Sequence, residues 1–414
     1  MEKLNDYLYL ANGNVFNTQT LDIFSLEDNY LRVLRMCLAK QKIIGDDIAI
    51  AKELGEGGLL KDYRRRDSNH EMVFDPSFVA FRIVLGEVCN LKCKNCFVLN
   101  RAFQPIKMSE TLLRQIIEKT FVYGKDKSIK YHFFGGEPLL MFDLIKMAVS
   151  MIEKVFDDGL IKEPIFTITS NGTLITKEIA EYLASHRIKI GLSLDGPENE
   201  NDQIRGQGTY RKVITSFRIL ERYNVERWFL ITPYSQILSG VPEFVDSLRR
   251  DFSFETITFN TPFQGDDLTW AVNGRELARK LLECYANFRD TGISIESAVS
   301  PILYALSTGT TRNFPCSIAG DDVMASIAPD GRVSFCAQYW DKSMFQSLFI
   351  KDFDLTRNYT RMSNCSGCIA EKICGGPCMV NFHKKGGIDG NKCGFYRTVL
   401  EQFIKEPAKY ISEE

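Results

Sequence analysis

Two patterns of apolar residues alternate along the middle of this chain. Runs rich in β-branched and aromatic residues are separated by segments whose apolar residues recur every three or four positions. The first pattern predicts buried strands and the second predicts helices that cover them. Strands are expected at 79–85, 129–134, 165–169, 188–194, 227–232 and 256–260, and helices at 109–121, 144–155, 177–185, 210–223, 241–250 and 276–289. This alternation predicts an α/β fold with a parallel sheet wound into a partial (β/α)6 barrel, fewer units than the eight of a closed TIM barrel.

The two ends of the chain show different patterns. Near the N-terminus, Asn12-Gly13 separates two short apolar runs and predicts a β-hairpin, with helices following from about residue 27 and over 46–54. The polar stretch 61–67 predicts a linker, and the chain after residue 310 is rich in loops and cysteines. We therefore expect a small α+β domain over 1–75, a barrel core over 76–300 and a loop-rich domain over 301–414.

Composition and charge narrow the possible partners. The chain has 414 residues, a formal net charge of −2 and 44% hydrophobic residues, which is typical of a globular protein. Without a basic excess, neither nucleic acid nor an anionic membrane is expected as a partner. No apolar run resembles a signal peptide or a membrane span, so a cytoplasmic location is expected.

The chain contains twelve cysteines. In a reducing cytosol, cysteines are more often metal ligands or catalytic groups than disulfide partners. Ten of the twelve fall into two closely spaced groups. Cys37 and Cys284 stand apart in helical apolar patterns, and we expect both to behave as buried hydrophobic residues.

The first group, Cys89, Cys93 and Cys96, has the spacing CxxxCxxC at the end of the first barrel strand. A [4Fe–4S] cluster needs a ligand on each iron, so three thiolates leave one iron open to bind another molecule. Loops at this end of the strands are also where α/β barrels carry their chemistry. A zinc site or free thiols would be the other interpretations, but zinc usually takes a fourth protein ligand.

Over residues 79–300 the chain resembles the radical S-adenosylmethionine (SAM) superfamily. The resemblance implies that the open iron binds SAM and that the reduced cluster cleaves it to methionine and a 5′-deoxyadenosyl radical. Gly135-Gly136-Glu137-Pro138 resembles the family's GGEP motif, which holds the SAM amino group, since glycines let backbone approach a ligand and a carboxylate suits an ammonium. By the same resemblance Ser193 and Arg205 bind the SAM carboxylate, while Ser170 and Asn171 reach the ribose. The stretch from Asp195 to Arg205 lacks the histidine that the family usually carries there.

The second cysteine group has the spacing C-x14-G-x4-C, a gap, C-x2-C-x5-C-x3-C, another gap and C, and it consists of Cys316, Cys336, Cys365, Cys368, Cys374, Cys378 and Cys393. This pattern resembles the SPASM extension of radical SAM enzymes. That resemblance implies two auxiliary [4Fe–4S] clusters, and hence three clusters in all. The outer one would take Cys365, Cys368, Cys374 and Cys393, and the inner one Cys316, Cys336 and Cys378. Pro329-Asp330-Gly331 predicts a hairpin turn between Cys316 and Cys336. Seven thiolates leave one iron of the inner cluster without a cysteine, and a pair of zinc knuckles is the other interpretation.

Enzymes of this kind differ in the reaction they perform, and the fold does not decide among them. Some oxidise a cysteine or serine of a sulfatase to formylglycine, and others join side chains of a small peptide. The N-terminal segment weakly resembles a domain that binds a leader peptide as an added strand, although it could also be a simple cap of the barrel. We therefore favour a maturase that installs a carbon–carbon cyclophane, ether or thioether crosslink in a ribosomally made precursor peptide.

Two alternatives to this function stay open. One is a sulfatase-maturing enzyme, and the other is a non-catalytic iron–sulfur scaffold, against which the SAM-binding motifs argue. The expected partners are a precursor peptide with its leader and an electron donor such as flavodoxin or ferredoxin. Asp321, Asp322 and Tyr339 lie near the inner-cluster cysteines in sequence, but nothing in the sequence selects a general base among them.

Overall fold

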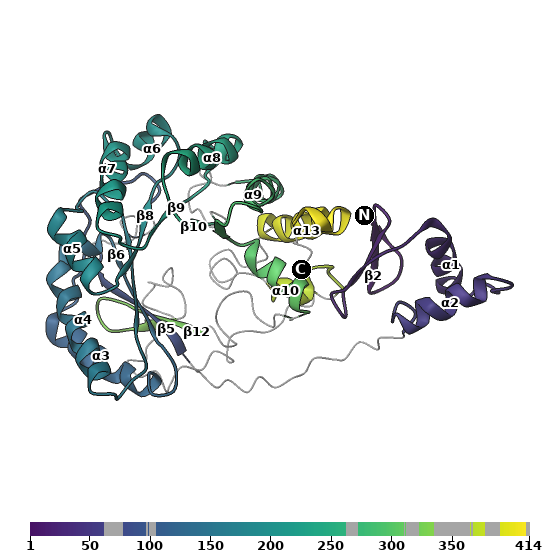
Figure 1. Ribbon diagram of the computed structural model, residues 1–414, viewed down its shortest axis with the longest axis horizontal. Helices are drawn as coiled ribbons and strands as arrows, with labels where there is room; N and C mark the ends of the chain where they lie inside the picture. Colours follow the sequence, from purple (N-terminus) through teal and green to yellow (C-terminus); the bar gives the residue numbers. More distant parts are fainter. Residues whose placement is uncertain are drawn as a thin grey trace.

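The computed structural model describes residues 1–61, 78–96, 98, 105–261, 272–309, 311, 323–334, 365, 367–376 and 390–410. These residues form a small antiparallel sheet near the N-terminus and a large, mainly parallel sheet in the middle of the chain (Figure 1). Most of the predicted linker at 61–67 lies outside the described residues. Among the described residues, no helix is long and apolar enough to cross a membrane.

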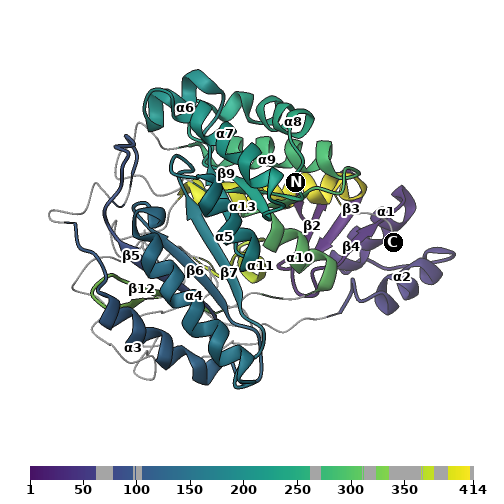
Figure 2. The same ribbon diagram turned by 60° about the vertical axis from the view of Figure 1, so that its left-hand side comes forward.

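The large sheet follows the alternation that the sequence predicts. Its central strands, each parallel to the next, are β5 (Phe78–Gly86), β6 (Lys130–Gly135), β7 (Ile165–Ser170), β8 (Lys189–Ser193), β9 (Arg227–Ile231) and β10 (Thr256–Phe259). The connecting segments carry α3 (Glu110–Thr120), α4 (Phe142–Asp157), α5 (Lys177–Ser185), α6 (Glu198–Arg205), α7 (Thr209–Arg222) and α8 (Val241–Asp251). Figures 1 and 2 show these helices on the outer side of the curved sheet. The carboxyl ends of all six strands therefore meet at one edge.

Alternation along each strand separates an apolar face from a more polar one. On β6, Tyr131 and Phe133 are fully buried and belong to the core beneath the helices. His132, between them in sequence, projects to the opposite face, where its Nδ1 lies 2.8 Å from the hydroxyl of Thr167 on the neighbouring strand. The face away from the helices thus carries polar side chains deep in the sheet.

Three strands beyond the predicted six lengthen the sheet. β11 (Ser294–Glu296) lies parallel to β10, β12 (Val323–Ile327) lies parallel to β5, and β13 (Val333–Ser334) pairs antiparallel with β12. The six-stranded expectation was therefore too short. β11 and β13 are only a few residues long, and β12 joins a partner from far earlier in the chain, which no local pattern reveals. The predicted turn at Pro329-Asp330-Gly331 joins β12 to β13, while Cys316 and Cys336 lie outside the described residues.

The N-terminal residues form a second, smaller unit. Strands β1 (Glu2–Lys3), β2 (Leu8–Ala11), β3 (Asn14–Asn17) and β4 (Ile23–Ser25) pair antiparallel in chain order, and α1 (Asp28–Leu38) and α2 (Asp47–Glu56) follow them. The predicted Asn12-Gly13 turn joins β2 to β3, with both residues at positive φ. Leu8, Val15 and Leu34 are fully buried in a core separate from that of the barrel.

The C-terminal helix α13 (Gly390–Lys405) joins the two units. It packs against α9 (Gly274–Phe288) and lies beside the N-terminal sheet (Figure 1). The side chain of Asn14 on β3 donates to the carbonyl of Ile404 at 2.7 Å, in a buried position. A Cβ on Gly274 would lie 1.8 Å from the carbonyl oxygen of Asn391, so only glycine fits where α9 meets α13. The N-terminal unit is therefore anchored on the helix that carries Cys393.

Shorter elements complete the described chain. They are α10 (Ser300–Thr308), α11 (Glu371–Cys374) and the 3-10 turns Phe121–Tyr123, Pro138–Met141, Leu238–Gly240 and Pro407–Lys409.

Candidate active site

The loop that follows β5 carries Cys89, Cys93 and Cys96, each partly exposed. Burial is the main cause that raises the pKa of the Cys93 thiol to about 11; Arg205 opposes this shift, and the nearby thiols of Cys96 and Cys89 add to it. The N–H of Lys94 donates to the carbonyl of Ile204 at 3.0 Å and ties the loop to α6. The three thiols therefore share one anchored loop at the carboxyl edge of the sheet.

The segment after β6 packs its backbone directly on the start of this loop. The N–H of Gly136 donates to the carbonyl of Gly86, and the N–H of Glu137 donates to the carbonyl of Val88, both at 2.9 Å. A Cβ on Gly136 would lie 2.2 Å from the Val88 oxygen, and one on Gly135 would lie 2.5 Å from the Gly86 oxygen. The two glycines thus let two stretches of backbone approach each other, whatever they also offer a ligand.

The carboxylate of Glu137 lies fully buried between the ends of β6 and β7. Its Oε1 accepts hydrogen bonds from the Ser170 hydroxyl at 2.8 Å and from the N–H of Leu139 at 3.0 Å, and its Oε2 accepts one from the N–H of Asn171 at 2.7 Å. Burial raises the pKa of Glu137 to about 7, against these donors, which favour the ionised form. Glu137 therefore fastens the two strand ends together.

Asn171 connects the end of β7 to the cysteine loop. Its Oδ1 accepts from the N–H and the hydroxyl of Thr173, at 2.9 and 2.8 Å. Its Nδ2 donates to Oδ1 of Asn90 at 2.9 Å and lies 3.7 Å from Sγ of Cys89. Burial raises the pKa of Cys89, while the N–H of Leu91 and the Asn171 amide counteract it. The first, second and third strand ends thus form one hydrogen-bonded unit.

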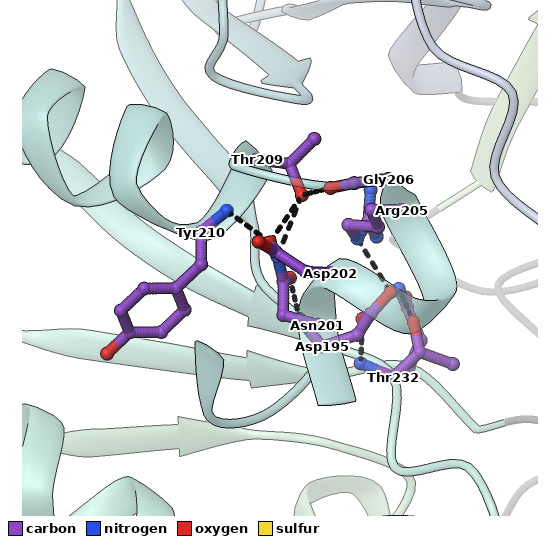
Figure 3. Close-up of polar contacts among 9 residues, drawn as sticks. Asp195, Asn201, Asp202, Arg205, Gly206, Thr209, Tyr210 and Thr232 are labelled. Atoms are coloured by element: carbon purple, nitrogen blue, oxygen red, sulfur yellow. Dashed lines mark hydrogen bonds and ion pairs between the residues drawn. The ribbon is translucent and has the colours of Figure 1, made fainter. Parts of the chain in front are cut away.

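A buried ion pair links the next two strand ends (Figure 3). Nε of Arg205, at the end of α6, donates to Oδ2 of Asp195 at 2.7 Å, and the N–H of Thr232 after β9 donates to Oδ1 of the same carboxylate at 2.9 Å. Burial opposes the guanidinium charge, but Asp195 and Cys93 raise the pKa of Arg205. Ser193, the last residue of β8, is also buried and lies two positions before Asp195 in the sequence. Arg205 therefore stands as a fixed cation close to the cysteine loop.

The side chains of Asn201 and Asp202 form hydrogen bonds that hold the chain between Asp195 and α7 in place (Figure 3). Asn201, fully buried, accepts from the N–H of Asp195 at 3.1 Å and donates to the hydroxyl of Thr209 at 2.9 Å. Asp202 accepts from the N–H groups at the start of α7, including that of Tyr210 at 2.9 Å, and caps this helix. Asn201 stands within the stretch that lacks the expected histidine, and its amide supplies both a donor and an acceptor there.

Four of the seven C-terminal cysteines are described, and they lie near one another. Burial raises the pKa of Cys393 on α13, and the neighbouring thiols of Cys374, Cys368 and Cys365 act on it electrostatically. Around α11, the N–H of Cys368 donates to the carbonyl of Cys365 at 3.1 Å. Cys316, Cys336, Cys378, Asp321, Asp322 and Tyr339 lie outside the described residues.

The two remaining cysteines, predicted to be buried, differ in their exposure. Cys284 is fully buried in α9, and burial raises its pKa to about 12. Cys37 is only partly buried and packs against the N-terminal core. Neither lies among the two cysteine groups.

The three thiols of the cysteine loop match the donor set of an iron–sulfur cluster that is open at one iron. A zinc ion needs its ligand atoms within about 2.3 Å of one point. Among the described residues, no three histidine, cysteine or acidic side chains are grouped closely enough to hold one metal ion. Each thiolate on a [4Fe–4S] cluster binds a different iron, so the ligands are spread around the cluster and need not converge. Three thiolates are enough to bind three irons of such a cluster and to leave the fourth open.

Comparison with known proteins identifies the family. Residues 83–243 match the model of the radical SAM superfamily, a segment that begins within β5 and contains the cysteine loop, the Glu137 contacts and the Asp195–Arg205 pair. The protein carries a radical SAM domain. The family implies a [4Fe–4S] cluster, and the assignment of Cys89, Cys93 and Cys96 as its ligands stays a prediction.

Relatives of this chain include a cyclopropyl synthase and a sulfatase-maturating enzyme. The radical SAM cyclopropyl synthase TigE of Paramaledivibacter caminithermalis is 23% identical over 362 residues, covering 79% of this chain and 74% of TigE. A cysteine-type anaerobic sulfatase-maturating enzyme of Clostridium novyi is 29% identical over 147 residues, covering 33% of this chain and 39% of that enzyme. These relatives agree with an enzyme and not with a non-catalytic scaffold.

Solved structures share the fold of this radical SAM enzyme. The anSMEcpe structure with bound AdoMet aligns with a TM-score of 0.67 at 19% identity, covering 80% of this chain and 98% of that one. Streptococcus suis SuiB bound to precursor peptide SuiA aligns with a TM-score of 0.59 at 19% identity, covering 95% of this chain and 100% of that one. The likeness to SuiB thus extends over more of this chain.

Several residues of the SAM-binding end of the barrel carry no obvious sequence signal. Asn90, Thr173 and Thr232 all make contacts that hold the predicted residues in place. Only Thr173 had a local clue, because the Asn-Gly-Thr sequence favours a turn in which the asparagine side chain accepts from the backbone two residues on. The contacts of Ser193, Arg205, Ser170 and Asn171 with SAM stay a prediction.

Proposed function

We propose that this enzyme is a maturase that joins two side chains of a ribosomally made precursor peptide. When bound, the cluster and SAM supply a 5′-deoxyadenosyl radical, which takes one hydrogen atom from a peptide side chain. Closing the crosslink then releases one more proton and one electron, so the product is lighter than the precursor by two hydrogen atoms. The auxiliary clusters proposed for the C-terminal cysteines would accept that electron, and a flavodoxin or ferredoxin would supply the electron that starts SAM cleavage.

The observation that carries the proposal is the N-terminal unit. Its four strands and two helices precede the barrel, and its strands β2 and β3 pack on α13, with Asn14 bonded to Ile404. Structures of SuiB, one with a bound precursor peptide, align over 91–95% of this chain, whereas the anSMEcpe structures align over 80%. An exposed sheet edge is a common place for an extended peptide to add as a strand. We therefore assign residues 1–75 to leader recognition, 76–300 to the radical SAM core and 301–414 to the SPASM domain.

Of the two edges of the N-terminal sheet, β4 offers the better template. The N–H of Asn17 donates to the carbonyl of Asp22, and the N–H of Leu26 donates to the carbonyl of Gly13. Because bonding directions alternate along antiparallel strands, Ile23 and Ser25 direct their N–H and C=O groups away from β3. At the other edge, strand β1 has only two residues. By the same alternation, only Lys3 of these two directs its N–H and C=O groups away from β2. A leader strand would therefore gain more main-chain bonds on β4.

A sulfatase maturase is the second candidate function. Relatives of this class match at 29% identity over 33% of this chain in the Clostridium novyi enzyme and at 23% identity over 70% of this chain in the Clostridium perfringens enzyme. A sulfatase maturase would form a different product. It converts a single cysteine or serine to an aldehyde and forms no bond between side chains. The N-terminal unit would then be only a cap.

One experiment separates the two functions. The reconstituted enzyme is incubated with SAM and dithionite, first with a short peptide encoded beside its gene and then with a sulfatase-derived peptide. Mass spectrometry should find the precursor lighter by two hydrogen atoms, with fragmentation blocked between the joined residues. The Cys89→Ala/Cys93→Ala/Cys96→Ala variant serves as the control and should give no product. Formylglycine in the sulfatase peptide, with no change in the precursor, would replace the crosslinking proposal by the second function.

A further inference from the structure

The side chain of Asn171 approaches a cluster ligand from the third strand of the barrel. We propose that Asn171 donates a hydrogen bond to Sγ of Cys89 and thereby raises the reduction potential of the barrel cluster, the cluster held by Cys89, Cys93 and Cys96. The inference rests on Cys89 as a cluster ligand and not on the identity of the peptide substrate. Asn171 would be a positioning residue that acts through Cys89.

A ring of hydrogen bonds fixes the direction of the Asn171 amide. Its Nδ2 donates to Oδ1 of Asn90 at 2.9 Å, Nδ2 of Asn90 donates to the hydroxyl of Thr173 at 2.8 Å, and that hydroxyl donates to Oδ1 of Asn171 at 2.8 Å. Turning the Asn171 amide over would place its N–H groups against two donors of Thr173 and would break the ring. Its Nδ2 therefore faces the cysteine loop, with Sγ of Cys89 at 3.7 Å.

The same contacts use every hydrogen-bonding position of this side chain. An asparagine amide offers two donors and accepts two bonds. The donors of Asn171 point to Asn90 and Cys89, and its oxygen accepts the N–H and hydroxyl of Thr173. Its backbone N–H is held by Glu137 at 2.7 Å. With all these groups engaged within the chain, Asn171 is better placed to support the cysteine loop than to bind a ribose hydroxyl.

The direction of the effect follows from charge. Reduction adds one electron to the cluster and increases the negative charge on its thiolate ligands. Hydrogen bonds to those sulfurs stabilise the reduced state and raise the potential. Cys89 receives two such donors, the Asn171 amide and the N–H of Leu91 at 3.4 Å. Asn171 is buried, so water screens its dipole less than it would at the surface. A higher potential makes the cluster easier to reduce before it cleaves SAM.

The test is a redox titration of the holoenzyme followed by electron paramagnetic resonance. Asn171→Asp keeps the oxygen that Thr173 binds but puts an acceptor in place of the donor to Cys89, and Asn171→Ala removes both. Ser247→Ala is the control, because its hydroxyl donates to the carbonyl of Phe244 at 2.7 Å within α8 and does not contact the cluster loop. The signal that changes on SAM addition marks the barrel cluster. We expect its potential, measured without SAM, to be more negative in both Asn171 variants and unchanged in Ser247→Ala.

Iron content, measured first, separates a redox effect from cluster loss. Fully loaded Asn171 variants with the potential of the wild type would overturn the proposal. If both variants lack the barrel cluster, the potential of Thr173→Val tests the proposal instead. This substitution leaves Asn171 in place but removes the hydroxyl that closes the hydrogen-bonded ring and orients the Asn171 amide. A more negative potential in Thr173→Val then supports the proposal, and an unchanged one overturns it. Product formation does not enter either measurement, so the outcome is independent of the proposed peptide substrate.

Discussion

Arg205 donates from Nε to Oδ2 of Asp195 at 2.7 Å, with the length of α6 between the two residues. The Asp195 side chain is fully buried, and that of Arg205 is 15% exposed. Because Nε is engaged, the outer nitrogens of the guanidinium are held in a fixed orientation near the cysteine loop. This geometry suits recognition of a carboxylate, which pairs well with a planar, fixed guanidinium.

We predict that Asp195→Asn weakens both folding and SAM binding. Removing one member of a buried pair leaves the other charge without compensation, at a cost of about 3 kcal/mol. The freed Arg205 should also bind SAM about tenfold more weakly, as measured by anaerobic equilibrium dialysis. Arg211→Ala is the control, because its ion pair with Glu198 at 2.6 Å lies on the surface and should change stability by less than about 1 kcal/mol. Equal SAM affinity in Asp195→Asn and the wild type would contradict this role.

Gly136→Ala should prevent assembly of the barrel cluster. The added methyl group would lie 2.2 Å from the carbonyl oxygen of Val88, so the cysteine loop would have to move. From about twelve irons per chain for three four-iron clusters, we expect iron analysis after reconstitution to show a loss of about a third. In the control Gly240→Ala, the new methyl group meets no atom within 4 Å. A Gly136→Ala enzyme with the full iron content and SAM cleavage would show that the loop tolerates the shift.

Glu137 should make the stability of the protein depend on pH. Its folded-state pKa of about 7 lies above the ordinary value of 4.5, so the folded protein retains a proton that the unfolded chain has released. Stability from this group is complete below about pH 4.5 and falls as pH rises to about 7, by up to about 3 kcal/mol. Thermal unfolding of the wild type and of Glu137→Gln, followed by circular dichroism, should therefore diverge over this range. Parallel curves would mean that the three donors keep the carboxylate ionised throughout.

Local patterns predicted the barrel strands well because each is a short run rich in apolar, β-branched or aromatic residues. Tyr131 and Phe133, for example, point to the helices and are fully buried. The strands that were missed depend on distant partners: β12 pairs with β5, and its register joins Ser326 to Arg82. A short segment between loops gives no local signal of such pairing.

The residues chosen from their spacing lie at one edge of the sheet, but the spacing did not predict the contacts among them. Glu137 and Arg205 were chosen for the charges they offer a ligand, yet each is bonded to its own chain, through Ser170 and Asp195. Asn201 was visible only as a departure from the family pattern. Its bonds to Asp195 and Thr209 depend on the turn into α7, which the sequence does not specify residue by residue.

Cys374→Ala should separate SAM cleavage from product formation. The barrel cluster would still generate the radical, while the proposed path for the second electron would be interrupted. We expect continued release of 5′-deoxyadenosine, measured by liquid chromatography, with little or no crosslinked peptide. Cys284→Ala is the matched control, since this cysteine is fully buried in α9 and lies in neither group. Normal product formation by Cys374→Ala, with the outer cluster shown to be absent, would rule out the electron-acceptor role.

Leader recognition can be tested at a single backbone N–H group. Deleting residues 1–75 should weaken peptide binding far more than SAM binding, but it also uncovers α13, which Asn14 contacts. Ser25→Pro is a sharper test, because it removes an N–H that points away from β3 on the edge strand β4.

The matched control for this variant is Ser25→Ala. Both substitutions lose the 2.6 Å hydrogen bond from the Ser25 hydroxyl to Asn14, but only proline removes the main-chain donor. A lost main-chain hydrogen bond of about 1 kcal/mol predicts leader binding at least about fivefold weaker in Ser25→Pro, by fluorescence anisotropy of a labelled leader peptide. SAM cleavage without peptide should be equal in both variants, since the barrel residues are untouched. If Ser25→Pro and Ser25→Ala bind the leader equally well, β4 is not the docking edge. If the enzyme without residues 1–75 also modifies the full precursor at the normal rate, the N-terminal unit is only a cap.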